Sequence, residues 1–556
     1  MTRPLELLQQ GRKEELWQMC CGFLKLSLEQ FMGIQKRLLL EQIGLLENCE
    51  MGRRLLGGAR PLTVEEFRTQ VPLTTYDDYL PELTDKREDV LPARPAMWVH
   101  TIGKPGDYTI KNVPMSERFL SEFERVAGGV GLLASCNERG EFPLREHMKV
   151  LSSTGSRFYG AGIIGYLLKE ALGCDFLAGP ASEAPFQERT KAAFKEALCR
   201  GIDAPGGLST ILVYVGELLK QEGLNLDARF LLSHPQAAAR LLRGLAKSKL
   251  ARRPLLPRDL WDIKIALGGG TDGAVFRQSV EELWGKRPLE IYGGTEGGIY
   301  ATQTWDYEGM TFVPHLSFFE FIPEREWFKW QLDRSYQPKT VLLNEVRAGH
   351  KYEIVITNFH GGIMTRYRPG DMIKITALRN DKLGIAIPQM EFDKRADDLI
   401  ILFGVGHLTE KLIAEAIENT GIPYADWTAR KEVLDGRPAL HIYLEIADHY
   451  IASEQSVAAS VYHELEKLDA VYRFNLHKYA YGDALSYLKL KPLAVSFLPQ
   501  GAIAGYIAQR RSEGAAREAS RPPRINPSDQ VLSLLRAPEV AVEAAPATEA
   551  ERARTR

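Results

Sequence analysis

The sequence predicts an α/β protein: a large N-terminal α/β domain with a β-rich subdomain, followed by a small mobile α+β C-terminal domain. From about residue 145 to 300, short strand-like runs alternate with helical stretches, which is typical of a largely parallel sheet covered by helices. From 310 to 376, strand-like runs follow one another with few helices between them. A charged segment near residue 393 then precedes a shorter α+β unit.

The elements can be taken in chain order. Residues 13–50 carry apolar side chains at helical spacing and predict one or two amphipathic helices. Residues 63–83 begin as a short helix that breaks at Pro72. The alternating region then comprises strand-like MKVLSS (148–153), helical GIIGYLLKEAL (162–172), strand-like LSTILVYV (208–215) and DIKIALGGG (262–270), helical AVFRQSVEELW (274–284) and strand-like PLEIYGG (288–294).

Three regions follow from this pattern: a large N-terminal domain at 1–393, a small C-terminal domain at 394–530, and a disordered tail at 531–556. The C-terminal unit contains strand-like ALHIYLEIA (439–447) and a helix at about 453–468. From about 537 the chain is rich in Ala, Pro and Glu and poor in large apolar residues, a composition typical of disorder.

Composition indicates an ordinary globular protein. The 556 residues are 45% hydrophobic and 26% charged, with a formal net charge of −2, so no basic excess points to nucleic acid. The sequence contains no run of 18 apolar residues, so it predicts no membrane-spanning helix. The N-terminal stretch is too polar for a secretion signal. Six cysteines without a C-x-x-C pair indicate a reduced, cytoplasmic protein. We expect neither nucleic acid nor a membrane as partner.

The segment KVLSSTGSRFYGAGIIG (149–165) leaves a predicted strand with hydroxyls and glycines. Such a turn presents N–H and O–H donors that suit a phosphate chain. A plain strand–helix turn is the simpler alternative. The run GAGIIG (160–165) also matches the dinucleotide fingerprint formally, but seven residues separate it from the strand and no acid follows at the usual distance.

Two further glycine-rich turns follow. In ALGGGTDGAVF (266–276), glycines would let the backbone approach a flat ligand closely; the alternative is a tight turn with a helix cap. In EIYGGTEGGIY (290–300), Tyr292 can stack on a purine, Thr295 can donate to a phosphate, and Glu296 is a hard oxygen ligand for Mg²⁺ carried by nucleotide phosphates. A glycine-rich bend with an exposed acid is the alternative reading.

Two acidic segments complete the series. In GIMTRYRPGDMIKI (362–375), Asp371 lies between a Pro-Gly turn and a strand, where it can accept both hydroxyls of a ribose; a solvated turn is the alternative. In DKRADDLIILFG (393–404), charges precede an apolar strand. This segment is either a solvated boundary or a hinge on which one domain rotates.

The order of these five segments resembles the adenylate-forming superfamily of acyl-CoA synthetases, luciferases and nonribosomal adenylation domains. Within it, the chain resembles the acyl-acid amido synthetases, the plant auxin- and jasmonate-conjugating family with bacterial relatives. The resemblance spans roughly residues 10–535. It is carried by VPLTTYDDY (71–79), TNFHGGIMTRYRPGD (357–371) and RPPRINPSDQV (521–531).

The resemblance implies ATP and Mg²⁺ as cofactors and assigns the site by position. It matches the phosphate loop to Ser152, Ser153, Thr154, Gly155 and Ser156, the adenine-side turn to Gly269, Gly270 and Thr271, the stacking ring to Tyr292, the phosphate and metal contacts to Thr295 and Glu296, the ribose ligand to Asp371, and the hinge motif to Arg395 and Asp397.

The chain also departs from the superfamily pattern. No lysine follows the 152–156 segment closely, and Arg521 takes the place of a late lysine. Lys489 or Lys491 can supply the missing cation, and we predict Glu296, Asp397 and Lys491 as the catalytic residues.

The implied activity is that of an ATP-dependent ligase that activates a small carboxylic acid as acyl-AMP and transfers the acyl group to an amine or amino acid. One alternative is an acid–thiol ligase, with KSKLARR (247–253) binding the 3′-phosphate of coenzyme A. Others are a non-catalytic nucleotide- or acid-binding relative and an NAD(P)-dependent oxidoreductase. We expect residues 208–235 and the aromatic 310–330 segment to line the acyl pocket, although the latter also fits a core strand.

Overall fold

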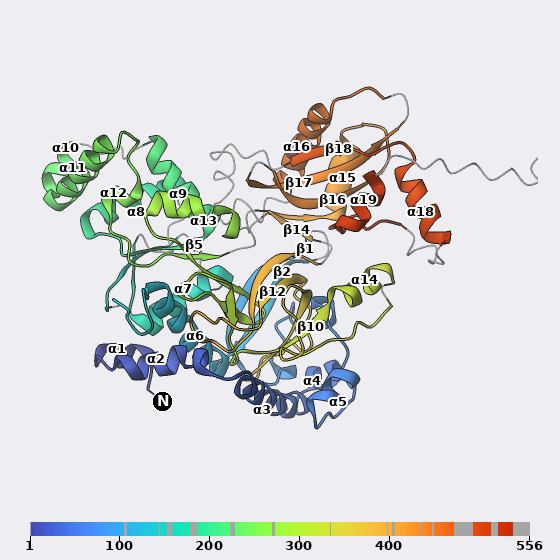
Figure 1. Cartoon of the computed structure of the whole chain (residues 1–556), viewed down its shortest axis with the longest axis horizontal. Coiled ribbons are helices and arrows are strands. Elements are labelled where there is room, and N and C mark those ends of the chain that lie inside the picture. The colour runs from blue at the N-terminus through green and yellow to red at the C-terminus, as the bar shows by residue number, and fades with distance from the viewer. Residues whose placement is uncertain are drawn as a thin grey trace, which may run out of the picture.

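A computed structural model gives the arrangement of the chain (Figure 1). The described residues are 2–104, 108–143, 145–152, 158, 160–177, 186–222, 228–269, 273–333, 335–396, 399–402, 406–434, 436–447, 450–471, 493–512 and 521–536.

Within these residues, one sheet of eleven strands runs in the order β10-β11-β12-β13-β9-β8-β7-β6-β5-β3-β4. Its parallel part consists of β3 (Lys149–Ser152), β4 (Asp175–Leu177), β5 (Ala204–Leu208), β6 (Leu267–Gly269) and β7 (Leu289–Gly294). Its antiparallel part consists of β8 (Gly298–Thr302), β9 (Met310–Phe312), β10 (Ser317–Pro323), β11 (Lys351–Asn358), β12 (Asp371–Ala377) and β13 (Gln389–Arg395). The predicted parallel region and β-rich subdomain are therefore joined in one sheet.

Helices cover this sheet, and the N-terminal ones gather on the lower side of Figure 1. Helix α3 begins after Ser27, whose hydroxyl accepts from Gln30 N while the Gln30 side chain accepts from Ser27 N, a reciprocal cap. The helices are α1 (Pro4–Gln9), α2 (Lys13–Cys21), α3 (Leu28–Glu47), α4 (Glu50–Leu55), α5 (Val64–Gln70), α6 (Glu117–Ser135), α7 (Gly160–Leu172), α8 (Phe186–Arg200), α9 (Ser209–Glu222), α10 (Ala228–Ser233), α11 (Pro235–Leu250), α12 (Pro257–Leu260), α13 (Gly273–Trp284) and α14 (Glu324–Leu332).

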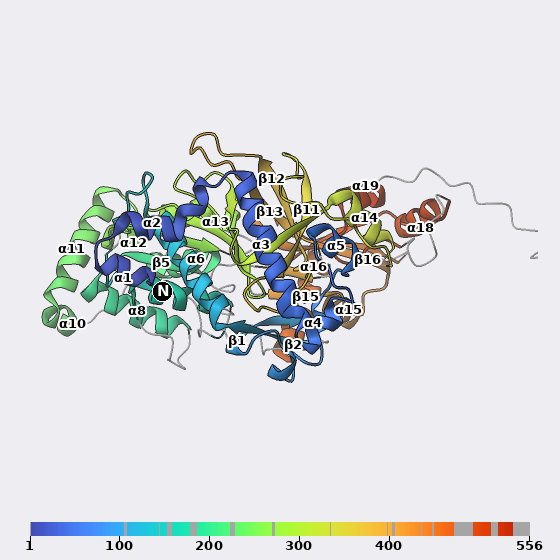
Figure 2. The ribbon, with the colours of Figure 1, turned by 90° about the horizontal axis from the view of Figure 1, so that it is seen from below.

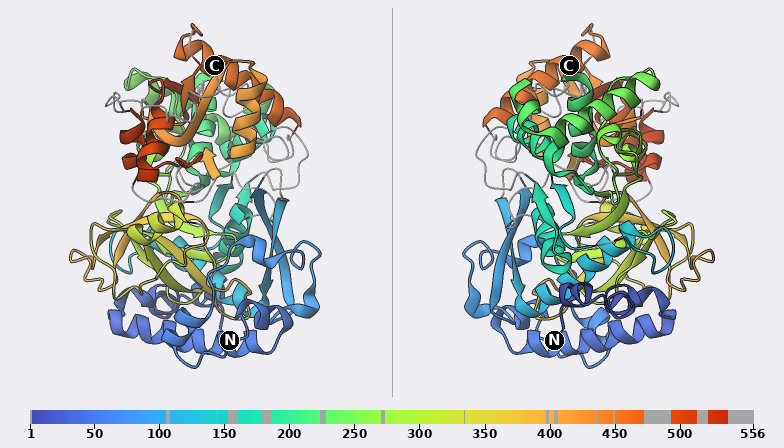
Figure 3. Two further views of the ribbon diagram at one scale, coloured as in Figure 1. Left: turned by 90° about the vertical axis from the view of Figure 1, so that its right-hand side faces the viewer. Right: turned by 90° about the vertical axis from the view of Figure 1, so that its left-hand side faces the viewer.

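Two smaller β units accompany the large sheet. The hairpin of β1 (Pro95–Lys104) and β2 (Tyr108–Ser116) precedes α6. The C-terminal part has a two-stranded sheet, β14 (Leu399–Leu402) and β15 (Gly406–Thr409), and a three-stranded sheet, β16 (Tyr424–Leu434), β17 (Arg437–Ile446) and β18 (Leu493–Phe497), with α15 (Glu410–Asn419), α16 (Glu454–Val471), α18 (Ala502–Ser512) and α19 (Asp529–Arg536). Figure 3 shows this C-terminal part and the N-terminal helices at opposite ends of the molecule.

One predicted strand is wrong. Within the predicted strand 208–215, residues 209–215 form the start of helix α9, and only Leu208 belongs to a strand, as the last residue of β5. Ile211, Leu212 and Tyr214 are each at most 1% exposed, so the helix is buried on several sides. An apolar run of this length does not distinguish a buried helix from a buried strand by periodicity.

Two predicted boundaries need correction. Residues 394 and 395 belong to β13 of the large sheet, because Asp371 pairs with Arg395 across the β12–β13 ladder, so the N-terminal domain extends past 393. The tail predicted from 531 begins too early. Helix α19 continues to Arg536 and buries Leu532 and Leu535 against Tyr443 and its neighbours.

The six cysteines are free thiols. Among the described helices, none combines the length and apolar character that crossing a membrane requires.

Candidate functional site

The predicted glycine- and hydroxyl-rich segments leave the large sheet at one edge. Ser152 ends β3, Gly269 ends β6 and Gly294 ends β7, and these strands run parallel. Carboxyl ends of parallel strands meet at the same edge, where open α/β sheets bind ligands. The other predicted residues Ser153, Thr154, Gly155, Ser156, Gly270, Thr271, Asp397, Lys489 and Lys491 lie outside the described residues.

A tight turn at 295–297 joins β7 to β8 and presents Glu296. The glycines around it are required by packing within the protein. A Cβ on Gly293 would lie 2.2 Å from the Gly298 carbonyl oxygen, and one on Gly297 would lie 2.5 Å from the Tyr300 ring. Gly298 also adopts a φ of +76°, which favours glycine. The hairpin itself therefore requires glycine at these three positions.

The Glu296 carboxylate lies in a polar cluster. Its Oε1 accepts from Lys111 Nζ and from the Tyr367 hydroxyl, each at 3.0 Å, and its backbone carbonyl accepts from Asn358 Nδ2 at 3.0 Å. The side chain is 11% exposed. Burial alone would raise the pKa of Glu296, but the Lys111 charge and these hydrogen bonds outweigh it and hold the pKa below its ordinary value. The carboxylate is therefore ionised and already paired.

Lys111 was missing from the predicted site. It lies on β2, and its Nζ also lies 3.0 Å from the Tyr367 hydroxyl and 5.3 Å from the Tyr76 ring centroid. The sequence signal was GKPGDYTIK (103–111), in which a glycine-rich turn separates two strand-like runs and a lysine follows. The β1–β2 hairpin thus brings a positive charge to Glu296. The cation predicted from the sequence, Lys489 or Lys491, lies outside the described residues.

A second cluster surrounds Asp371 at the start of β12. Its Oδ1 accepts from Arg395 at 2.6 Å and its Oδ2 accepts from the Tyr292 hydroxyl at 2.9 Å. Arg395 also donates to the Pro369 carbonyl at 2.9 Å. Tyr292 and Arg395, which were predicted from separate segments, therefore both bind the carboxylate of the predicted Asp371. The Tyr292 ring is buried and packs edge-on against Tyr300, so its role as a stacking face stays a prediction.

Tyr300 lies between the two clusters. Its ring centroid is 5.3 Å from that of Tyr292, and a Cβ on Gly294 would lie 3.0 Å from its hydroxyl. Burial raises the pKa of Tyr300, and the negative charges of Glu296 and Asp371 raise it further. Tyr300 therefore adjoins both clusters: its ring packs on Tyr292, and a Cβ on Gly294 would lie near both its hydroxyl and Glu296 Oε2, at 3.0 and 3.4 Å.

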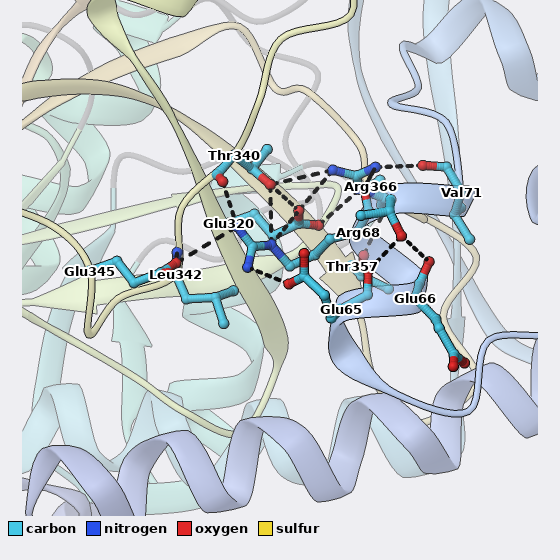
Figure 4. A network of polar contacts seen from close by, with 11 residues as sticks. Glu65, Glu66, Arg68, Val71, Glu320, Thr340, Leu342, Glu345, Thr357 and Arg366 are labelled. Carbon is cyan, nitrogen blue, oxygen red and sulfur yellow. Dashed lines mark hydrogen bonds and ion pairs between the residues drawn. The ribbon is translucent and has the colours of Figure 1, made fainter.

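A buried ion pair supports the segment that carries Tyr367 and Asp371. Arg366 donates to both Glu320 oxygens, at 3.0 and 2.8 Å, and the Thr340 hydroxyl donates to Glu320 at 2.7 Å. Arg366 also bonds the Arg68 and Val71 carbonyls (Figure 4). The Arg366 and Glu320 side chains are 5% and 0% exposed, so this bidentate pair is desolvated and fully hydrogen-bonded, the condition under which burial of charge is tolerated.

Two segments that carried the resemblance contact each other here. Thr74 N donates to the Arg366 carbonyl and Arg368 N donates to the Thr74 carbonyl, both at 2.9 Å. Thr365 N donates to the Tyr79 hydroxyl at 2.8 Å. The VPLTTYDDY segment (71–79) therefore holds the TRYRPGD segment (365–371) in place through these hydrogen bonds. Arg366 adopts a φ of +44°, a strained conformation held by these contacts.

The aromatic 310–330 segment lies in the core. Phe318, Phe319 and Phe321 are each at most 1% exposed and join the main hydrophobic cluster. These phenylalanines therefore belong to a core strand, which was the alternative to an acyl-pocket lining. Residues 208–235 are the other segment predicted to line the acyl pocket.

Residues 310–395 match the GH3 family central domain. The chain is 33% identical over 164 residues to the jasmonoyl–L-amino acid synthetase JAR4 of Nicotiana attenuata, covering 29% of this chain and 26% of that protein. It is 24% identical over 248 residues to the indole-3-acetic acid-amido synthetase GH3.3 of Arabidopsis thaliana, covering 43% and 38%. The chain thus matches about a quarter to two fifths of these relatives' length.

The fold has a solved counterpart. A 2-hydroxyisobutyryl-CoA ligase in complex with its acyl-AMP and CoA superposes with a TM-score of 0.52 at 14% identity, covering 85% of this chain and 87% of that one. This confirms the α/β architecture. The predicted resemblance is confirmed as well: residues 310–395 match the GH3 family central domain, and the chain is similar to acyl-acid amido synthetases.

Proposed function

We propose that the protein is an ATP-dependent ligase that activates a carboxylic acid as acyl-AMP and transfers the acyl group to an amine or amino acid. The observation that carries this proposal is the Glu296–Lys111–Tyr367 cluster at the end of β7, beside the Asp371 cluster. Similarity to synthetases that join an acid to an amino acid supports it.

The nucleotide is assigned to the carboxyl edge of the sheet. Asp371 accepts the ribose hydroxyls, Tyr292 and the Gly269–Thr271 turn contact the base, and Thr295 with the 152–156 segment donates to phosphate. Arg395 orients Asp371, since it already donates to it at 2.6 Å. Lys111 takes the role of the missing phosphate cation, because its Nζ lies within reach of the same carboxylate that is assigned to the metal.

The donor set fits Mg²⁺ that arrives with the nucleotide. The described part of the chain contains no group of three or more His, Cys, Asp or Glu that could hold a metal by itself. Glu296 offers one ionised carboxylate, and Mg²⁺ is usually bound by one or two carboxylates together with substrate phosphates. When bound, the ion supplies positive charge next to the phosphates.

The first step joins two anions. A substrate carboxylate oxygen attacks the α-phosphorus of ATP and pyrophosphate leaves. Two unit charges 4 Å apart repel by about 4 kcal/mol at an effective dielectric near 20. Lys111, held by Glu296 and Tyr367, offsets part of this repulsion without reorganising. In the second step an amine nitrogen attacks the acyl carbonyl, loses its proton, and AMP leaves.

Water must be kept from the acyl-AMP, because the mixed anhydride hydrolyses. We assign closure of the site to rotation of the small C-terminal domain about Asp397. The same rotation would present a different face to the amine in the second step. Lys491 stays assigned to this domain as a second candidate cation.

Two alternatives to amide formation are separable by experiment. An acid–thiol ligase uses coenzyme A, and the superposed ligase binds CoA, but that similarity concerns the fold. The feature that supports a non-catalytic relative is that no lysine follows the 152–156 segment closely. The Lys111–Glu296 contact at 3.0 Å weighs against that alternative, since it provides a lysine at the proposed site.

ATP–pyrophosphate exchange across a panel of carboxylic acids tests the proposal. We expect exchange with at least one acid, and a loss of more than about 100-fold in Glu296→Gln, which removes one charge-stabilising group. Glu308→Gln is the matched control, because Glu308 is a largely exposed acid. No exchange with any acid, together with no ATP binding by calorimetry, would refute an adenylating enzyme. Mass spectrometry with amino acids, amines and coenzyme A then identifies the acceptor.

A further inference from the structure

Helix α11 packs on the protein with small residues and turns its leucines outward. Its buried positions are Ala237, Gly244 and Ser248. A Cβ on Gly244 would lie 2.6 Å from Leu260 of α12, so the helix sits close to its neighbour there. Arg240 fixes it further by donating to the Leu198 and Cys199 carbonyls. The inward face of α11 therefore packs closely on the protein through small residues. The most exposed leucines of α11 lie on its other face.

The outward face carries an apolar ridge. Ala239, Leu242, Ala246 and Leu250 recur at intervals of three or four residues and are all exposed, so they line one side of the helix. Leu242 and Leu250 are 67% and 88% exposed, and Leu232 on the adjoining α10 is 84% exposed. Exposed apolar residues that gather in one place mark an interaction surface more often than scattered ones do.

Positive charges flank this ridge. Residues 228–258 contain Lys and Arg but no Asp or Glu. Arg243, Lys247, Lys249 and Arg252 are exposed, and none forms an ion pair with another residue that the structure describes. On a helical projection, Arg243 and Lys247 fall on one side of the ridge and Lys249 on the other. Long basic side chains beside an apolar ridge are typical of helices that lie in a lipid interface.

The position of α11 suits a flat partner. Helices α10 and α11 lie at the extreme end of the molecule in two perpendicular views (Figures 1 and 2). A helix at such an end can contact an extended surface without obstruction by the other helices and strands that the structure describes. A second copy related by a two-fold axis fits less well, because it would set the cationic flanks of both copies against each other.

We propose that the outward face of α11 binds the surface of an anionic lipid bilayer, with the leucines entering the interface and the lysines and arginines meeting the head groups. The expectation of no membrane partner rested on the absence of a spanning segment. A helix that lies in the interface needs none. The proposal is independent of the proposed ligase activity.

Vesicle flotation of the full chain tests this surface. We compare vesicles of phosphatidylcholine alone with vesicles that also contain phosphatidylglycerol. We expect at least tenfold stronger partitioning to the anionic vesicles. Raising the salt from about 0.1 M to about 1 M should abolish the difference, because the Debye length falls from about 10 Å to about 3 Å.

Two double variants separate the contributions. Lys247→Glu with Lys249→Glu should weaken partitioning to anionic vesicles by more than about tenfold, since each basic residue near an anionic surface contributes about a fivefold gain. Leu242→Ser with Leu250→Ser should weaken it by a similar factor through lost apolar burial. The controls are Leu62→Ser, a leucine that is 78% exposed elsewhere, and Lys374→Glu with Lys382→Glu; neither should change partitioning.

Several results would overturn the proposal. One is binding to neither vesicle; another is equal binding by all variants. A concentration-dependent dimer in light scattering, without vesicle binding and lost in the leucine variant, would assign the face to a second copy. Binding only to an acidic amphipathic peptide would assign it to a protein partner.

Discussion

At the scale of single residues, the pairing of Glu296 with Lys111 sets the character of the site. Both side chains are largely buried, at 11% and 16% exposure. Removing one partner of such a pair leaves an uncompensated charge, which is more destabilising than the pair itself is stabilising. The Tyr367 hydroxyl shares the same oxygen, so the carboxylate is held in one orientation before any ligand binds.

Lys111→Met should destabilise the fold in a pH-dependent way. In the wild type the folded pKa of Glu296 lies below its ordinary value of 4.5, so its contribution to stability is full above about pH 4.5 and is lost as the pH falls through the folded pKa. Without Lys111, burial dominates and raises that pKa. Stability should then fall as the pH rises above about 4.5. We expect a loss of about 3 kcal/mol at pH 7 and less than half of it near pH 4.5.

Urea unfolding at the two pH values measures this difference. Lys374→Met is the matched control, because Lys374 pairs with Glu391 at 3.5 Å on the surface, where both side chains are at least 41% exposed. Such a pair contributes less than about 1 kcal/mol. A loss in Lys111→Met that is equal at both pH values would show that packing, and not the charge of Glu296, accounts for the effect.

At the scale of elements, the site depends on turns that a few long-range contacts support. The hairpin of β7 and β8 presents Glu296, and the Arg366–Glu320 pair holds the segment before β12. The motifs at these turns were recognisable because glycine, proline and charged residues mark turns locally. The pairing of Lys111 with Glu296 was not recognisable, because the two residues lie 185 positions apart in the sequence.

Helix α19 provides a direct test of the corrected C-terminal boundary. Leu535 is 0% exposed, whereas the adjacent Leu534 is 40% exposed. We expect Leu535→Ala to lower the free energy of unfolding of the C-terminal part by about 2–5 kcal/mol and Leu534→Ala to change it by less than about 0.5 kcal/mol. Thermal unfolding of the two variants measures this. Equal, small effects would favour a tail that begins at 531.

At the scale of the whole molecule, the large sheet and the C-terminal part meet next to the site. Arg395, at the end of β13, bonds Asp371 within the site and is followed by Ala396, where the chain leaves the large sheet. The C-terminal part then follows from β14 onward. A change in the backbone after Arg395 would therefore move this part relative to the proposed nucleotide site.

Asp397→Pro should separate the two half-reactions. Proline fixes φ near −65° and restricts rotation about the proposed hinge, so amide formation should fall by more than about tenfold relative to ATP–pyrophosphate exchange. Asp397→Ala, which leaves the backbone free, should retain that ratio. Exchange and product formation measured on the same preparations give both rates. An equal loss of both activities in the proline variant would argue against a rotating hinge.

The sequence by itself determined the α/β class, the succession of strand-ending turns and the resemblance to the acyl-acid amido synthetases. These features depend on local spacing, so neighbouring residues suffice to predict them. Only the tertiary structure decided that 209–215 is helical, that Lys111 meets Glu296 and that α11 turns its leucines outward. The physical reason is the same in each case: burial and charge pairing depend on which distant faces meet, and periodicity along the chain does not specify that.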